Sequence, residues 1–286
     1  MQVGQRVALA GMAVSSVLAV VKIVIGAAGG STSVVADGLE SAGDVFASGF
    51  VLLGLTIAAK PADENHPYGH GRVEILTGLL IGLILLAGGV GISWRSLGKV
   101  AEIHAPPAVF VIWPLVASAV IKSVLSGLKF HFGKKIHSAA LVADAWNDSV
   151  DILSGLVALI AVVLSLYDPS RFLAADHYGG FAVGIIVIFT GLRVARDTAF
   201  QLMDTMPDEN LMNTIREVAL RVPGVRGVEK CYARKTGLTY HVDLHLEVDP
   251  NLTVRESHNI ATEVRVHLKD SLEWVADVLV HVEPTP

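Results

Sequence analysis

The sequence predicts an α-helical membrane protein, in which six transmembrane helices are followed by a small α+β (αββαβ) cytoplasmic domain. The composition and the distribution of polar residues support this fold class. The chain has 286 residues, 52% of them hydrophobic, and a mean hydropathy of +0.56, which is high for a soluble domain. Apolar residues dominate from about residue 7 to residue 200. From about residue 204 onward the chain is charged, with mixed helical and strand patterns.

Six stretches are candidates for transmembrane helices, since a span needs roughly 20 mostly apolar residues. They cover about 7–28, 33–58, 73–94, 107–128, 139–166 and 178–200. A single stretch of this kind could be a buried helix of a soluble protein, but six in the first 200 residues favour a membrane bundle. No cleavable signal peptide is evident, so the first stretch is predicted to remain as a span.

The predicted domain boundary lies in "QLMDTMPDEN", where Pro207 and the acidic residues end the last apolar helix. It divides the chain into a membrane domain, 1–203, and a soluble domain, 204–286. Lysine and arginine are more frequent in the loops that share a side with the N-terminus, so both termini are predicted to be cytoplasmic. The net charge of −5 argues against nucleic acid as a partner, and the single Cys231 excludes an internal disulfide.

Carboxylates interrupt the second and the fifth predicted spans, where ionisable groups are costly and tend to carry function. Glu40 and Asp44 are four residues apart, and so are Asn147 and Asp151, so each pair lies on one helical face. If the two helices pack, the four side chains converge as oxygen ligands for a divalent cation. The alternative is that they cap helices or meet water. For the nearby Asp37, Asp144 and Asp148, a helix-start or packing role is favoured.

A polar loop, "HPYGHGRVE" at 66–74, lies between the second and third spans. With the preceding aspartate it offers one oxygen and two imidazole ligands, from Asp63, His66 and His70. A zinc-protease helix is disfavoured because Pro67 and Gly69 oppose a regular helix. The alternative is that the two histidines only bond the loop backbone.

The soluble tail is predicted to order its elements as helix, two strands, helix and strand, with the helices on one face of the sheet. The first helix starts after Pro207. The second helix is predicted to be capped by Thr253 with Glu256, and the second strand alternates between apolar and polar residues from Tyr240 to Glu247. Histidine is frequent in this tail.

These features together resemble the cation diffusion facilitators over essentially the whole chain: six spans, paired acidic elements in the second and fifth, an HPYGHGR-type loop and an acidic tail. The resemblance implies a homodimeric, lipid-embedded antiporter that exports divalent transition metals against protons, and not an enzyme. Its transport site would be Glu40, Asp44, Asn147 and Asp151. The loop residues Asp63, His66 and His70 would bind a second metal ion, and Arg72 would pair with Asp204.

For the tail, the resemblance implies a dimerising, metal-sensing domain with four candidate ligands, His245, His258, His281 and Glu283. Glu229 takes a further position that is often histidine in zinc-transporting members. Cys231 could be a soft ligand or a core residue. His241 and His267 are less favoured as ligands.

The metal is predicted to be manganese or ferrous iron (Mn²⁺ or Fe²⁺), with zinc (Zn²⁺) as the alternative, because the transport site lacks the histidine common at the Asn147 position. No organic cofactor is expected. Short loops favour a prokaryotic inner (plasma) membrane. Two other functions stay open: a membrane-anchored metal sensor and a passive divalent-cation channel.

Overall fold

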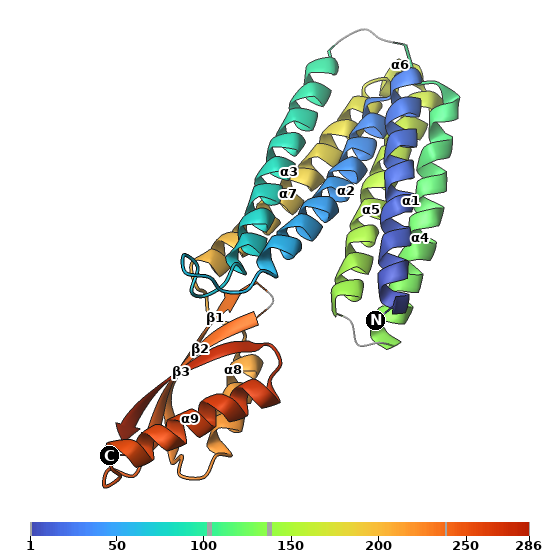
Figure 1. Ribbon diagram of the computed structural model, residues 1–286. Helices are drawn as coiled ribbons and strands as arrows, with labels where there is room; N and C mark the ends of the chain where they lie inside the picture. The colour runs from blue at the N-terminus through green and yellow to red at the C-terminus, as the bar shows by residue number, and fades with distance from the viewer. Residues whose placement is uncertain (1, 102–104, 136–138, 238, 286) are drawn as a thin grey trace. The chain divides into compact units, whose positions relative to one another are not determined.

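The computed structural model describes residues 2–101, 105–135, 139–237 and 239–285 (Figure 1). The chain divides into two compact units. One is helical and comprises residues 1–50 with 80–195, and the other comprises residues 51–79 with 196–286. The side chain of Asp144, for which we predict a packing or helix-start role, lies outside the described part.

The long helices carry the predicted membrane domain. They are α1 (Gln2–Ala28), α2 (Thr32–Ala58), α3 (Arg72–Lys99), α4 (Ile112–Lys135), α5 (Ala139–Tyr167) and α7 (Ala175–Leu202), and short helices at Val109–Val111 (η1) and Pro169–Phe172 (α6) join some of them. Among the described residues, five helices are long and apolar enough to cross a membrane. The sixth long helix, α2, has 27 residues and at 1.5 Å per residue exceeds a hydrocarbon core of roughly 30 Å. The predicted six-span fold is confirmed.

Within the helical unit, α4 packs along α5 and also contacts α1 (Figure 1). Small residues allow close packing elsewhere in the bundle. A Cβ on Gly191 of α7 would lie 2.6 Å from the backbone nitrogen of Leu86 in α3, so only glycine permits this approach.

A buried aspartate holds the start of α2. Asp176, in the first turn of α7, is 1% exposed. Its carboxylate accepts hydrogen bonds from the Ser31 hydroxyl at 2.6 Å, the Thr32 amide at 2.6 Å and the Ser33 hydroxyl at 2.5 Å. These donors include an amide that the first turn of α2 leaves without an intrahelical partner. Asp176 therefore fixes the N-terminal end of the helix that carries Glu40 and Asp44.

The tail contains α8 (Glu209–Leu220), β1 (Gly227–Thr236), β2 (Thr239–Val248), α9 (Val254–Ser271) and β3 (Val275–Pro284) in the predicted order. The sheet order is β1-β2-β3, with β1 antiparallel and β3 parallel to β2. Helix α8 contacts β1, α9 contacts β3, and the two helices contact each other, so both cover one face (Figure 1). The predicted αββαβ fold is confirmed.

The tail core lies between these helices and the apolar face of the sheet. Val242, Leu244 and Leu246 alternate along β2 and are at most 1% exposed, as their spacing predicts. Cys231 packs in the same core, and burial raises the pKa of its thiol to about 11. A thiol with so high a pKa is rarely a thiolate near neutral pH, so Cys231 acts as a small core residue.

The predicted capping box of α9 is present. The Thr253 hydroxyl accepts a hydrogen bond from the Glu256 amide at 3.3 Å, and the Glu256 carboxylate accepts one from the Thr253 amide at 2.8 Å.

Replacing Thr253 by alanine should destabilise the tail by about 1 kcal/mol, because the helix start loses its side-chain acceptor. Since α9 covers the core that contains Cys231, alkylation of this single cysteine in the purified full chain should become roughly fivefold faster. Thr262→Ala, an exposed threonine in the middle of α9, is the control and should change the rate by less than about twofold. Equal rates in both variants would contradict a stabilising cap.

Candidate metal-binding sites

The four residues predicted to form the transport site line one small cavity in the helical unit. Glu40 and Asp44 come from α2, and Asn147 and Asp151 come from α5. The cavity measures about 10 Å³, close to the space that a single water molecule needs, and α3 and α7 close it with Leu85, Val187 and Thr190. Helical spacing and helix packing therefore bring these four side chains to one place.

The four side chains differ in their surroundings. Glu40 and Asp151 are each 6% exposed, Asp44 is half-buried and Asn147 is exposed. Asn147 hydrogen-bonds Asp44, which joins the two helices at the cavity. Glu40 Oε2 is buried and has no hydrogen-bond partner in the described part of the protein. An unsatisfied buried carboxylate oxygen is costly, so a cation or a donor in the cavity would relieve it.

Three buried lysines accompany these carboxylates. Lys22 of α1 contacts Asp37 at 2.8 Å and donates to the Ser41 hydroxyl at 2.6 Å. Lys122 of α4 contacts the Asp151 carboxylate directly and lies 3.7 Å from Asp148 Oδ1, while Lys129 contacts Asp148 Oδ2 at 2.5 Å. We name the following set the buried charge cluster: Lys22, Lys122 and Lys129 with Asp37, Glu40, Asp44, Asp148 and Asp151.

The buried charge cluster has two more carboxylates than ammonium groups. If all its members are ionised, the cluster carries two excess negative charges, which one divalent cation would balance. Asp37 and Asp148 pair with lysines and do not contribute to the described cavity lining, in agreement with the packing role favoured for them. The carboxylate oxygens of the transport site do not lie as close together as the ligand atoms around a bound metal ion. Over the described side chains, only two other groups place three such ligand atoms within 4.8 Å of one another.

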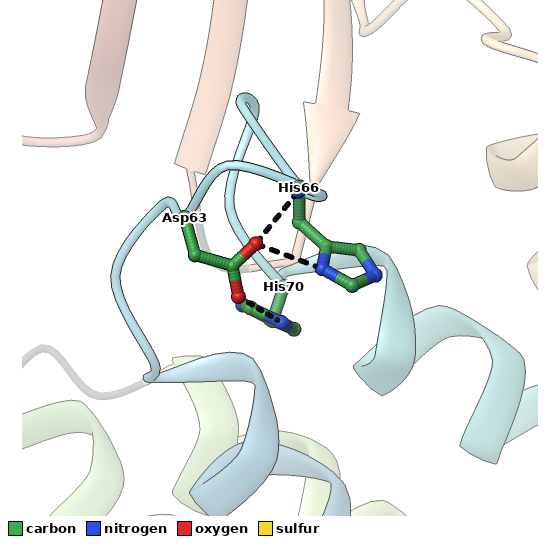
Figure 2. A group of neighbouring side chains, drawn as sticks. All are labelled: Asp63, His66 and His70. Carbon is green, nitrogen blue, oxygen red and sulfur yellow. Dashed lines mark hydrogen bonds and ion pairs between the residues drawn. The ribbon is translucent and has the colours of Figure 1, made fainter.

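The first of these two groups is the predicted loop site, Asp63, His66 and His70 (Figure 2). The Asp63 carboxylate lies 3.0 Å from His66 Nδ1 and 3.4 Å from His70 Nε2, and the two imidazole centroids are 4.3 Å apart. The other His70 nitrogen, Nδ1, lies 3.3 Å from the Pro61 carbonyl oxygen. One histidine thus contacts the backbone, as the alternative predicted, but its Nε2 still faces Asp63.

The loop backbone holds Asp63 ready as an anionic ligand. A hydrogen bond from the His66 amide, 2.7 Å long, is the main cause that lowers the pKa of Asp63, and the Asn65 amide adds to it. The carboxylate therefore stays ionised to a lower pH than an ordinary aspartate. Gly69, with φ of +79°, provides the left-handed turn that brings His66 and His70 onto the same carboxylate.

The loop also contacts the tail, within the same unit. The Tyr68 ring meets the His241 ring edge-on at 5.6 Å, and the Arg234 guanidinium lies 5.6 Å from the Tyr68 centroid. The predicted pair of Arg72 and Asp204 forms within one chain at 2.7 Å, with both side chains almost half exposed. An exposed pair of this kind contributes only about 0–1 kcal/mol.

The second group lies on the tail sheet and contains His245, His281 and Glu283. His245 and His281 are register partners on the parallel strands β2 and β3, with ring centroids 4.9 Å apart. Glu283 accepts a hydrogen bond from His245 Nδ1 and lies 3.6 Å from His281 Nε2. A hydrogen bond shared with Glu229, followed by the one with His245, lowers the pKa of Glu283.

Glu229, the further position that the resemblance implied, thus contacts the tail group. His258, the remaining predicted tail ligand, is exposed on α9 and does not join the group in the described residues. His241 contacts Tyr68, and His267 is exposed on α9.

Sequence reasoning did not include the lysines of the buried charge cluster among the functional residues. Their signal is present in the sequence, because Lys22 interrupts "VLAVVKIVIG" and Lys122 interrupts "VASAVIKSVLSG". A lysine in the middle of an apolar span needs a buried partner, and the aspartates of α2 and α5 are the available ones.

Spanning helices that enclose carboxylates, together with histidine and carboxylate groups in the loop and the tail, define an integral membrane protein that handles metal cations. Residues 8–203 match the family description "Cation efflux transmembrane domain", and residues 207–285 match "Cation efflux protein, cytoplasmic domain". The chain belongs to the cation diffusion facilitator family of divalent metal transporters, as its resemblance predicted. The family comprises transporters and not enzymes.

Several known proteins are similar to this chain over most of its length. The manganese efflux system protein MneP of Bacillus subtilis (strain 168) is 31% identical, covering 99% of this chain and 97% of that protein. The magnetosome protein MamB of Magnetospirillum gryphiswaldense is 29% identical, covering 93% of this chain and 89% of that protein. A solved structure titled "MamM-CTD 215-293" covers only 27% of this chain and 98% of that one, at 35% identity, with a TM-score of 0.27.

Replacing Asp63 by alanine should weaken metal binding by the loop at least about tenfold, because the two imidazoles lose the carboxylate between them. Titration calorimetry of the purified full chain with Zn²⁺ would measure the loss of one class of sites. His267→Ala removes an exposed histidine outside both groups and is the matched control. Unchanged isotherms for Asp63→Ala would contradict a metal site in the loop.

Proposed function

We propose that this protein is a proton-coupled antiporter that exports Mn²⁺ or Fe²⁺ from the cytoplasm, with Zn²⁺ as the alternative substrate. The observation that carries the proposal is the cavity that Glu40, Asp44, Asn147 and Asp151 line together. All four offer oxygen ligands, which suit the harder divalent ions better than a site containing histidine does. The similarity to MneP, whose name states manganese efflux, supports the same choice.

Proton coupling follows from the charge of the site. Carboxylates that share a buried cavity do not remain ionised together without a cation or protons, so metal binding and protonation exclude one another. A metal ion that enters from the cytoplasm displaces protons from the site. The helices then rearrange so that the site opens to the other side of the membrane, and protons from that side release the ion. When all members of the buried charge cluster are ionised, its two excess negative charges match one divalent ion.

The two predicted domains have separate roles in this proposal. Residues 1–203 transport, and residues 204–286 sense cytoplasmic metal and dimerise. The loop site of Asp63, His66 and His70 and the tail site of His245, His281 and Glu283 bind regulatory metal ions. The family match of the tail supports a homodimer, and the lysine and arginine distribution supports cytoplasmic termini in a prokaryotic inner membrane.

Gradient-driven transport tests the function. Purified protein in liposomes with an imposed pH gradient should take up Mn²⁺ or Fe²⁺ faster than Zn²⁺, and collapse of the gradient with a protonophore should stop the uptake. Asp151→Asn should lower uptake by at least roughly a hundredfold, because the site loses a charged ligand. Asp270→Asn, an exposed tail aspartate, is the control. Uptake that ignores the pH gradient would indicate a channel, and no uptake of any metal would indicate a sensor.

Asn147→His tests the metal preference. The imidazole adds the nitrogen ligand that Zn²⁺ prefers, so the ratio of Zn²⁺ to Mn²⁺ uptake should rise roughly tenfold in the same liposomes. Asn213→His, an exposed asparagine on α8, controls for an added histidine. A preference for Zn²⁺ in the unmodified protein would show that geometry outweighs ligand type.

A further inference from the structure

Lys122 is placed where a transported ion would have to bind. The residue is 1% exposed in the middle of α4, and its ammonium contacts the carboxylate of Asp151, a proposed ligand of the transported metal. A buried ammonium and a metal ion are both cations, so they compete for the same carboxylate oxygens. The charge of Asp151 is therefore already neutralised by the Lys122 side chain.

A second acceptor for Lys122 lies next to the first. Asp148 Oδ1 is 3.7 Å from the Lys122 nitrogen, one helical turn from Asp151 on the same helix α5. Lysine is a point charge on a flexible four-carbon chain, so a small rotation moves it between two such acceptors. Lys129 contacts the other oxygen of Asp148, Oδ2, at 2.5 Å, so Oδ1 is the oxygen of Asp148 that faces Lys122.

We propose that Lys122 is a tethered counter-cation of the transport site, which neutralises Asp151 when no metal is bound and moves to Asp148 when a metal ion takes its place. This inference rests on the proposed transport function and adds a residue to it. The proposal requires that Lys122 keep its charge in both positions. Lys122 positions charge, and it is not itself a ligand of the metal.

The tethered ammonium has a consequence for the transport cycle. In the proposed antiport cycle the metal-free, protonated carrier must return through the low-dielectric bundle, and an Asp151 carboxylate that is neither protonated nor paired would oppose this step. When Lys122 contacts Asp151, the metal-free protein carries less uncompensated charge during this return step. Metal exchange, in which a loaded carrier moves in both directions, does not need the empty form. Lys122 should therefore affect net transport and exchange differently.

The experiment compares these two modes in liposomes. Net transport is measured as Mn²⁺ uptake into metal-free vesicles, and exchange as uptake of radioactive Mn²⁺ into vesicles loaded with unlabelled Mn²⁺. Lys122→Gln should lower net transport roughly tenfold and leave exchange within about twofold. It should also tighten Mn²⁺ binding roughly tenfold in calorimetry, because the competing cation is gone. Lys122→Arg, which keeps the charge, should restore the ratio of net transport to exchange.

Lys22→Gln is the matched control. Lys22 is equally buried, but it pairs with Asp37 and not with Asp151, so its loss should change the two modes together. The proposal is overturned if Lys122→Gln lowers both modes equally, if it changes neither the ratio nor the affinity, or if Lys22→Gln separates the modes in the same way.

If size-exclusion chromatography shows that Lys122→Gln does not fold, the test uses Lys122→Arg alone. Its guanidinium holds a carboxylate through two donors, so it should weaken Mn²⁺ binding relative to the unmodified protein. Unchanged or tighter binding would overturn the proposal. Absence of both modes in the unmodified protein would instead refute the transport function, and the role of Lys122 with it.

Discussion

Charge cannot remain uncompensated inside a helical bundle that faces lipid, and this constraint organises the helical unit. The cost of an isolated buried ion is several kcal/mol, so each one needs a partner. Asp37, Asp148 and Asp151 have lysine partners, and Asp176 has the hydroxyls and amides at the start of α2. Glu40 keeps one oxygen without a described hydrogen-bond partner. Glu40 lines the cavity where the proposed substrate would bind, so incomplete compensation is present at that cavity.

The loop and tail sites follow a different logic from the cavity. Their ligands are exposed or half-buried, and their carboxylates are held by hydrogen bonds that lower the pKa of Asp63 and of Glu283. Such groups need no substrate to balance them. In the proposed function they would bind metal ions that equilibrate with the solvent, whereas the cavity would bind the ion that crosses.

The parts of the fold that the sequence could predict depend on local patterns. Long apolar stretches define the spans, and alternation along β2 and the Thr253–Glu256 capping box define tail elements, because hydropathy and capping act over a few residues. The spacing of Glu40 with Asp44 and of Asn147 with Asp151 also placed each pair on one helical face.

Pairings between helices were less accessible to sequence analysis. The contact of Lys122 with Asp151 joins residues that are 29 positions apart, and the contacts of Asp176 with α2 span more than 140 positions. Such contacts depend on which helices pack, and no local pattern encodes that choice. A lysine within a span signals that a partner exists without identifying it. The exclusion of His258 from the tail group likewise depends on where α9 lies against the sheet.

The parallel register of β2 and β3 has a consequence for how the side chains of the tail group can be exchanged. His245 and His281 face each other because the two strands are aligned at that rung, and Glu283 follows two positions later on the same face. The backbone ladder sets this alignment, whatever side chains occupy it. Exchanging one of these side chains therefore leaves the others in place, so in the proposed function a single substitution would alter the ligand set of the tail site without disturbing the fold.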